Sequence, residues 1–203
     1  MNCSFVDMNH LAHAYLSFEH PEVLVGNLIA DFVKSGPDLG LSGKIQLGVA
    51  LHHKIDEFTD THAVIKKAKE IFRPAFRLYA GPIVDVLNDY FLANDPGIFT
   101  ASTLKTFSGR VYETLEANAA FLPANFLKVL YYMKAQDWLF NYRHQYGIEK
   151  SLIGLSRRAA YMQNIAPAYQ LFLENEEYLA GCYREFFPSL KLFAAQQLEE
   201  LQG

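Results

Sequence analysis

The stretch SGKIQLGVALHHKIDEFTD, residues 42–60, indicates the fold class of this chain of 203 residues. Ser42 is a residue type that caps helices, and the segment after it lacks strand-like alternation. On a helix, His52 and Asp56 are four positions apart and share a face. Asp60 stays near that face if the helix continues, whereas His53 is turned away by about 100°. Taken alone, such a pair is more often a surface contact than a ligand pair.

Helical spacing extends over most of the remaining chain. Segments of about 10–20 residues lie between breaks marked by proline or glycine. These breaks fall at His20-Pro21, 35–37, Arg73-Pro74, Gly81-Pro82, 95–97, Leu122-Pro123 and Phe187-Pro188. No Gly-rich phosphate loop, repeat or long linker interrupts the pattern. We therefore expect one all-α domain of about eight to ten helices over residues 1–203.

Composition favours a folded protein with a large core. Hydrophobic residues make up 51% and charged residues 20% of the chain, and the formal net charge is −4. This charge gives the whole molecule no reason to bind nucleic acid or an anionic membrane. Cys3 and Cys182 imply no disulfide framework. The first residues do not resemble a signal peptide, and no apolar run approaches about 18 residues, so we expect a soluble cytoplasmic protein.

Further acids and an imidazole occur in otherwise apolar segments. Asp31 follows the apolar run of VLVGNLIADFV (23–33), where an ionised carboxylate costs several kcal/mol unless a cation or strong donors offset it. Asp85 and Asp89 are four apart in GPIVDVLNDYFL (81–92), and their repulsion favours a positive group between them. His13 lies on a mostly apolar helix. Each residue alone has an ordinary structural explanation, but together they predict a His/carboxylate cage suited to Mn²⁺, Fe²⁺ or Mg²⁺.

Cations gather in two places. Residues 66–77, KKAKEIFRPAFR, contain five cations and one acid: Lys66, Lys67, Lys69, Arg73 and Arg77 against Glu70. This segment is either a solvated helix or a docking surface for an acidic partner or a phosphate. Arg157 and Arg158 form a second pair after Gly154. Trp138 and Tyr142, one turn apart, are more typical of core than of a pocket.

Several of these segments resemble the acyl carrier protein phosphodiesterase family, and in the same order. The segments are MNHLAHAYLS (8–17), VGNLIADFVKSG (25–36), LHHKIDEFTD (51–60), FRPAFR (72–77), DVLNDYFL (85–92), WLFNYR (138–143) and SRR (156–158). The resemblance implies a variant of the HD-type metal phosphohydrolase fold. It also implies hydrolytic removal of 4′-phosphopantetheine from holo acyl carrier protein, with Mn²⁺ as the favoured metal and Mg²⁺ or Fe²⁺ as alternatives.

The family motifs match this sequence at particular positions. The motif N-L-A-H places its histidine at His13, and the motif G-N-L-x-A-D places its acid at Asp31. The motif H-x-x-x-D falls on His52 and Asp56, and the motif D-x-x-x-D falls on Asp85 and Asp89. Tyr90 stands where the resemblance leads us to expect a histidine, which leaves the role of that position open. Residues 1–7 precede the usual family start and are consistent with an upstream start codon or a short N-terminal extension.

The combined interpretation assigns three groups of residues. We expect a metal cage from His13, Asp31, His52, Asp56 and Asp85. We expect proton transfer and charge stabilisation from Asp56, Asp60, Asp89, Arg73 and Arg77. We expect Lys66, Lys67, Lys69, Arg157 and Arg158 to bind the substrate, since the carrier protein is acidic in this family. Spacing alone does not separate metal ligand from general base.

Three other interpretations stay open at this point. The chain could be an HD-like phosphohydrolase of another phosphoester. It could be an oxidative diiron enzyme, because helical His/carboxylate cages also hold iron. It could also be a non-catalytic module that binds a carrier protein through its basic segment.

Overall fold

The computed structural model describes residues 10–33, 40–158 and 164–203, and all statements below refer to these ranges. They contain ten α-helices, three 3₁₀ turns and no strand: α1 (His10–Tyr15), α2 (Pro21–Ile29), η1 (Ala30–Phe32), α3 (Gly43–Thr61), α4 (Ala63–Phe76), η2 (Arg77–Tyr79), α5 (Ala80–Ala93), α6 (Ala101–Ala117), η3 (Ala119–Phe121), α7 (Ala124–Ala135), α8 (Trp138–Asn141), α9 (Gln145–Arg158) and α10 (Ala166–Gln202). The expectation of an all-α protein is confirmed. The suggested extension over residues 1–7 lies outside the described residues, and the HD-type variant stays a prediction.

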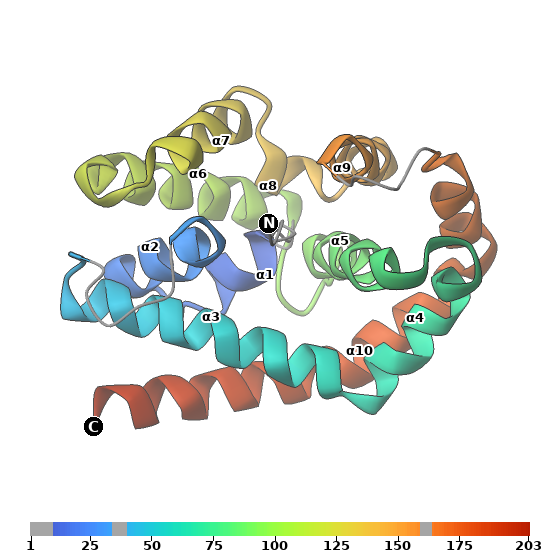
Figure 1. Cartoon of the computed structure of the whole chain (residues 1–203), viewed down its shortest axis with the longest axis horizontal. Helices are drawn as coiled ribbons and strands as arrows, with labels where there is room; N and C mark the ends of the chain where they lie inside the picture. Colours follow the sequence, from blue (N-terminus) through green and yellow to red (C-terminus); the bar gives the residue numbers. More distant parts are fainter. Residues whose placement is uncertain (1–9, 34–39, 159–163) are drawn as a thin grey trace.

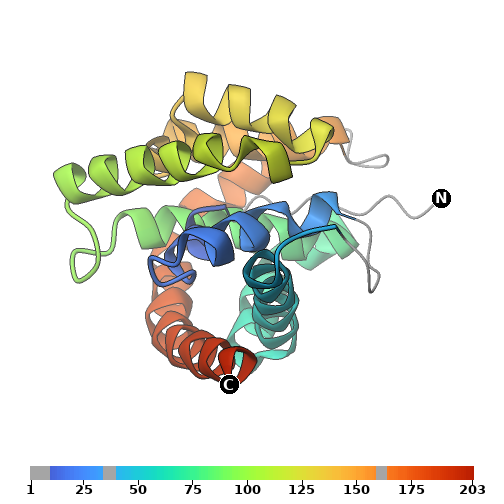
Figure 2. The ribbon, with the colours of Figure 1, turned by 90° about the vertical axis from the view of Figure 1, so that its left-hand side faces the viewer.

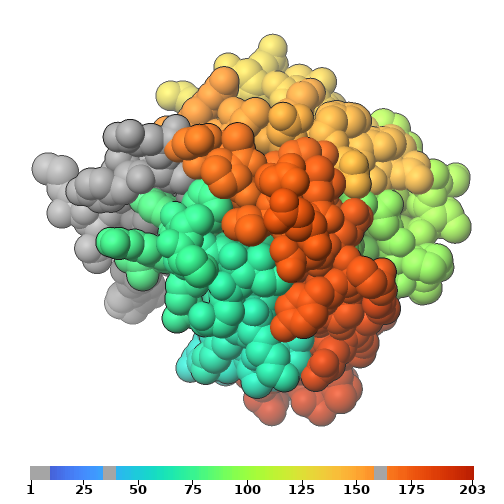
Figure 3. Space-filling view, turned by 90° about the vertical axis from the view of Figure 1, so that its right-hand side faces the viewer, coloured from blue at the N-terminus to red at the C-terminus, as the bar shows by residue number. Residues whose placement is uncertain are grey.

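The helices form three layers. In Figures 1 and 2, α6 to α9 lie on one side, α1, α2 and α5 lie in the middle, and α3, α4 and α10 lie on the other side. A single cluster of buried side chains joins the layers and includes Leu11, Ile55, Phe72, Leu87 and Phe172. Figure 3 shows the end of the molecule where α4, α5 and the first part of α10 meet below α9.

Helix α3 begins where its sequence predicts. The Ser42 side chain accepts a hydrogen bond from the Ile45 amide at 3.3 Å, which satisfies one free donor of the first turn. The helix runs to Thr61, so Asp60 belongs to it. His62 then leaves the helical conformation, and its ring accepts a hydrogen bond from the Val64 amide at 3.3 Å at the start of α4. His62 is therefore the boundary between α3 and α4.

Two predicted helix ends are wrong. Pro74 lies inside α4, and Pro188 lies inside the 37-residue helix α10. A proline removes one backbone donor and disturbs the preceding turn, yet the packing of both helices into the core keeps them continuous. Beyond Pro188, the Ser189 hydroxyl donates to the Phe186 carbonyl at 2.7 Å, which pairs one backbone acceptor near the proline.

Helices α2 and α3 cross at two glycines. A Cβ atom on Gly26 would lie 1.9 Å from the Ile45 carbonyl oxygen, and one on Gly48 would lie 2.1 Å from the Val23 carbonyl oxygen. Neither position accommodates a side chain while the helices stay in place. This close crossing brings Asn27 of α2 next to His52 of α3. Within the described ranges, no helix combines the length and apolar composition that crossing a bilayer requires.

Candidate metal centre

His13, His52 and Asp56 come together from α1 and α3. Each offers one ligand atom, and these atoms lie within 4.8 Å of one another. His13 Nε2 is 3.2 Å from Asp56 Oδ1, and His52 Nε2 is 3.0 Å from Asp56 Oδ2. The two imidazole rings stack with their centroids 4.2 Å apart. The predicted pair on α3 is thus completed by a histidine from a helix about 40 residues earlier in the chain.

Asp31 lies beside this group of three. It belongs to η1, the short turn that follows α2, and its Oδ1 is 3.5 Å from His52 Nε2. The side chain is 20% exposed, so one edge of the group is open to solvent. The structure therefore brings together four of the five metal candidates expected from the sequence.

Asn27 orients both imidazoles, a role that sequence analysis did not assign. His13 Nδ1 donates to the Asn27 side-chain oxygen at 2.7 Å, and His52 Nδ1 donates to the Asn27 main-chain oxygen at 2.8 Å. The side-chain amide of Asn27 donates to the His13 carbonyl and to the Ser17 hydroxyl, which fixes which end of the amide is the oxygen. Because both acceptors are oxygens without protons, a neutral ring keeps its lone pair on Nε2. The sequence feature that could have identified Asn27 is its position as a polar residue in the apolar run VLVGNLIA.

The group fits a divalent cation. The Nε2 atoms of His13 and His52 are buried, and within the described part of the chain neither has an aligned hydrogen-bond partner. The carboxylate of Asp56 is close to both atoms, but it lies off the N–H axes, so the short distances are not well-formed hydrogen bonds. Buried nitrogens without aligned partners require an explanation. Imidazole nitrogens beside carboxylate oxygens are a donor set that Mn²⁺, Fe²⁺ and Zn²⁺ accept.

The charges in the group are strongly coupled. Burial lowers the pKa of His52, but the neighbouring carboxylates of Asp31 and Asp56 outweigh it and raise that pKa to about 10. Burial raises the pKa of Asp56, but His13 and His52 outweigh it and hold that pKa well below its usual value. A proton and a divalent cation would therefore compete for the same nitrogen.

Asp89, for which we expect a catalytic role, lies outside the group of three. Its side chain is fully buried, and its two oxygens accept hydrogen bonds from the Leu11 amide at 3.0 Å and the Ala12 amide at 2.8 Å. Burial raises the pKa of Asp89 well above its usual value, while the two amide bonds act in the opposite direction. Both bonds are made to the first turn of α1, the helix that carries His13. We therefore interpret Asp89 as an anchor for α1.

Five other expected residues line one pocket between α4 and α5. This α4–α5 pocket has a volume of about 520 Å³ and contains Asp60, Lys69, Arg73, Arg77 and Asp85. Asp85, an expected metal ligand, thus lines this pocket and is outside the group of three. Asp60 lies one helical turn beyond Asp56 on α3, so the pocket begins next to the candidate metal centre.

The cations of the α4–α5 pocket are held in different ways. Lys69 is nearly buried and forms an ion pair with Asp60 at 2.6 Å, whereas Arg73 is exposed and pairs with Glu70 at 3.1 Å. Arg77 takes a φ of 49°, a conformation that residues other than glycine seldom adopt, at the turn from α4 to η2. Such strain is typical of functional sites.

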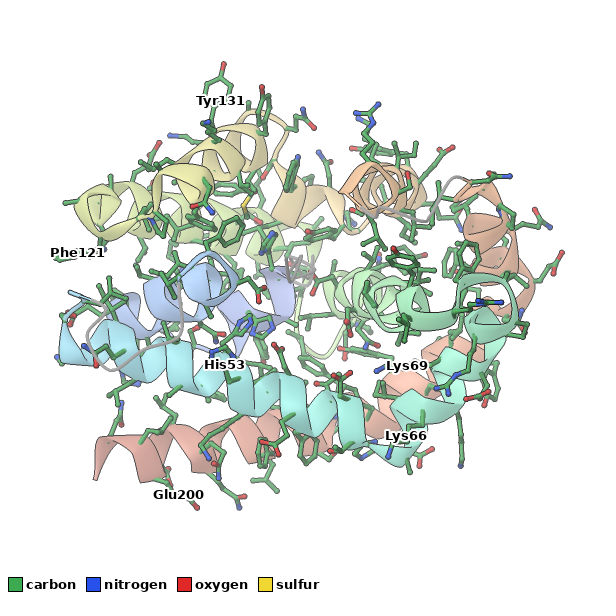
Figure 4. All side chains as sticks on the ribbon, in the orientation of Figure 1. His53, Lys66, Lys69, Phe121, Tyr131 and Glu200 are labelled. Carbon is green, nitrogen blue, oxygen red and sulfur yellow. The ribbon has the colours of Figure 1, made fainter. Side chains whose placement is uncertain are left out.

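The remaining expected residues lie elsewhere. Lys66 and Lys67 are exposed at the start of α4, and Figure 4 shows Lys66 at the lower edge of the molecule, apart from Lys69. His53 is exposed, in agreement with its predicted orientation away from His52. Arg157 lines a separate pocket between α8 and α9. Arg158 ends α9, and its side chain lies outside the described residues.

Tyr90, which replaces the histidine expected from the family motif, connects two helices. Its hydroxyl donates to Glu176 Oε1 on α10 at 2.9 Å. Burial and the Glu176 carboxylate raise its pKa to about 12, so the hydroxyl keeps its proton at neutral pH. This contact explains the tyrosine at position 90 as a residue that links α5 to α10.

Comparison with known proteins identifies relatives along nearly the whole chain. The family model described as acyl carrier protein phosphodiesterase matches residues 8–190. Proteins named acyl carrier protein phosphodiesterase are similar to this chain in Photorhabdus laumondii (27% identity, covering 89% of this chain and 92% of the relative), Pectobacterium atrosepticum (28%, 94% and 99%) and Klebsiella pneumoniae strain 342 (29%, 92% and 97%). No solved structure matches the chain.

Proposed function

Because the chain belongs to the acyl carrier protein phosphodiesterase family, we propose that it hydrolyses the phosphodiester between 4′-phosphopantetheine and a serine of holo acyl carrier protein. The observation that carries this proposal is the position of the His13, His52 and Asp56 group, one helical turn from a pocket with two arginines. The reaction would take place in the cytoplasm, as part of fatty acid metabolism.

We propose that His13, His52 and Asp56 hold a divalent cation, with Asp31 as a further ligand or neighbouring base. Mixed nitrogen and oxygen donors favour Mn²⁺ over a structural zinc ion, and Mg²⁺ or Fe²⁺ are alternatives. When bound, such a cation lowers the pKa of a water molecule and offsets negative charge on phosphoryl oxygens.

We assign proton transfer to a carboxylate at the solvent-exposed edge of the His13, His52 and Asp56 group. Both oxygens of Asp56 face imidazoles, whereas Asp31 approaches only His52. Asp31 is therefore better placed than Asp56 to take the proton of the attacking water. In the overall reaction, the water oxygen bonds to phosphorus, the bond from phosphorus to the serine oxygen breaks, and that oxygen leaves as a hydroxyl after gaining a proton. Asp60 would act indirectly, by holding Lys69.

The α4–α5 pocket would bind the phosphoryl end of the substrate. Arg73 and Arg77 present guanidinium groups there, which suit phosphoryl oxygens because they donate two hydrogen bonds in a fixed geometry. Lys66 and Lys67 are exposed on the same helix and would attract the acidic carrier protein. The docking surface expected over residues 66–77 is thus divided into two parts. Arg73 and Arg77 would bind the phosphoryl group, and Lys66 and Lys67 would attract the carrier protein.

The experiment is a mass measurement on the carrier protein. Purified protein is incubated with holo acyl carrier protein, with Mn²⁺ or with a chelator, and the carrier is weighed by mass spectrometry. We expect loss of the phosphopantetheine mass only with metal, and no loss with His52→Ala or Asp56→Ala. Unchanged carrier under all conditions, combined with turnover of another compound in a panel of phosphoesters, would instead support a different phosphohydrolase.

A further inference from the structure

A second pocket lies between α8 and α9. It has a volume of about 310 Å³, and it is lined by Gln136, Trp138, Asn141, Tyr142, Tyr146, Gly147, Lys150, Ser151, Gly154 and Arg157. This volume lies at the lower end of the range for small-molecule sites, about 300–1,000 Å³. The α8–α9 pocket shares no lining residue with the candidate metal centre or the α4–α5 pocket. The proposed function therefore does not account for it.

The pocket exists because α9 turns small residues toward α8. Gly147, Ser151 and Gly154 are four and three positions apart and share one face of α9. At Gly147 the two segments touch, since a Cβ atom there would lie 2.1 Å from the Asn141 carbonyl oxygen. Figure 1 shows α8 and α9 next to each other. Further along α9, the small side chains leave space that the neighbouring aromatic rings do not fill.

Aromatic rings form one wall of the pocket. The Trp138 indole donates to Gln136 Oε1 at 3.1 Å, and the Tyr146 hydroxyl donates to Asn141 Oδ1. These bonds hold the polar edges of the rings in place. The Tyr146 ring also stacks on His144, with centroids 5.2 Å apart, so Trp138 is the ring of this wall that is left for contact with a ligand. Tyr142 is buried, in line with its expected core role, whereas Trp138 is only half-buried and lines the pocket.

Two cations border the same space. Lys150 Nζ lies 5.2 Å from the centroid of the Tyr146 ring, and Arg157 follows two helical turns later on α9. Both side chains are exposed, and neither forms an ion pair with a carboxylate of the described residues. The pocket thus combines flat apolar surface with positive charge that no acid of this part of the protein neutralises.

We propose that the α8–α9 pocket binds an organic phosphate that carries a flat aromatic ring, such as a nucleoside monophosphate. The ring packs against Trp138, since stacking on an aromatic side chain is favourable for any planar base. The phosphate contacts Lys150 and Arg157, which supply charge-assisted hydrogen bonds. A phosphate without a ring, or a ring without a phosphate, makes only half of these contacts.

The chain contains one tryptophan, and it lines this pocket, so its fluorescence reports on occupancy directly. The full chain is titrated with adenosine 5′-monophosphate, and Trp138 is excited at the red edge of its absorption, where adenine does not absorb. Calorimetry supplies the dissociation constant independently. We expect a saturable signal with the nucleotide and binding weaker by about tenfold or more with adenosine or inorganic phosphate.

Variants locate the binding site. We expect Lys150→Ala and Arg157→Ala each to weaken nucleotide binding by about tenfold, and Ser151→Leu to abolish it by filling the space. Lys128→Ala, at an exposed lysine of α7 outside the pocket, is the matched control and should bind as the unmodified protein does. Circular dichroism verifies that each variant is folded.

Three results would overturn the proposal. The first is the lack of a saturable response to the nucleotide at millimolar concentration. The second is equal affinity for 4′-phosphopantetheine, which has no ring and would make the pocket a product site. The third is an equal loss of binding in Lys128→Ala and Arg157→Ala. The comparison of nucleotide, adenosine and phosphate needs no variant, so it decides the question even if a substitution unfolds the chain.

Discussion

Asn27 shows how one residue can set the chemistry of two others. It is fully buried, and it accepts a hydrogen bond from each imidazole of the candidate metal centre through two different oxygens. Neighbouring groups that fix the tautomer of a histidine ligand typically change metal affinity by 10–100-fold when they are removed. The spacing of His52 and Asp56 predicted a shared face, but spacing carries no information about what contacts Nδ1. The sequence therefore predicted residues that come together in the fold and missed the residue that orients them.

We expect Asn27→Ala to weaken metal binding by about tenfold or more and to lower the free energy of unfolding by about 2–3 kcal/mol. The physical reason is that His13 Nδ1 and the His13 carbonyl lose their buried partners. Calorimetry with Mn²⁺ and denaturant unfolding measure the two effects. Asn125→Ala, at an exposed asparagine, is the control, and equal effects of both substitutions would contradict the assigned role.

The pKa of His52 predicts how stability depends on pH when metal is removed by a chelator. Burial lowers this pKa, but Asp31 and Asp56 raise it overall from 6.5 to about 10. A raised pKa means that the ion pairs stabilise the fold fully below pH 6.5 and cease to do so as pH rises through about 10. We expect the difference in unfolding free energy between the unmodified protein and His52→Gln to narrow over this interval. The exposed His53→Gln serves as the control, and a difference that widens toward pH 10 would refute the prediction.

At the scale of helices, the crossing of α2 and α3 is the feature on which the site depends. Asn27 and His52 meet because Gly26 and Gly48 let two backbones approach. Helix α3 was predictable from its cap and its spacing, since both signals are local. The continuity of α4 and α10 through Pro74 and Pro188 was not, because packing against other helices outweighs the local effect of a proline.

We expect Gly48→Ala to lower the free energy of unfolding by about 2–4 kcal/mol and to weaken metal binding, since the added methyl group forces the helices apart. Thermal unfolding and Mn²⁺ calorimetry measure the two effects. Gly109→Ala on α6 is the matched control, because a Cβ atom there meets nothing within 4 Å. This second substitution should be neutral or stabilise the protein by up to about 1 kcal/mol. A neutral result for Gly48→Ala would show that the crossing is looser than the structure indicates.

At the scale of the whole molecule, charge is distributed unevenly. The net charge is −4, yet Lys66, Lys67, Arg73 and Arg77 all belong to one helix and the turn after it. The sequence predicted the cationic segment, but it could not show that Lys69 differs in role from the other cations. That difference depends on burial, since Lys69 is nearly buried whereas these other cations are exposed. Nor could the sequence predict that Asp85 lines the α4–α5 pocket and Arg157 a different one, since these placements depend on how distant helices pack.

We expect the double substitution Lys66→Glu, Lys67→Glu to raise KM for holo acyl carrier protein by about tenfold while kcat changes by less than about twofold. Attraction between exposed charges is screened by salt, so the activity of the unmodified protein should fall as salt rises. Lys128→Glu is the control, because this single substitution changes the charge at its own position as each of the other two does, but it lies on α7. Activity that stays flat up to about 0.5 M salt would remove the docking role from these lysines.

The most direct measurement is the anomalous diffraction of crystals grown with Mn²⁺. The account predicts a peak in contact with His13 Nε2, His52 Nε2 and the Asp56 carboxylate, and loss of that peak in His52→Ala crystals. Crystals with no ordered manganese, or with a peak only among the carboxylates of the α4–α5 pocket, would contradict the claim that these three side chains form the metal centre.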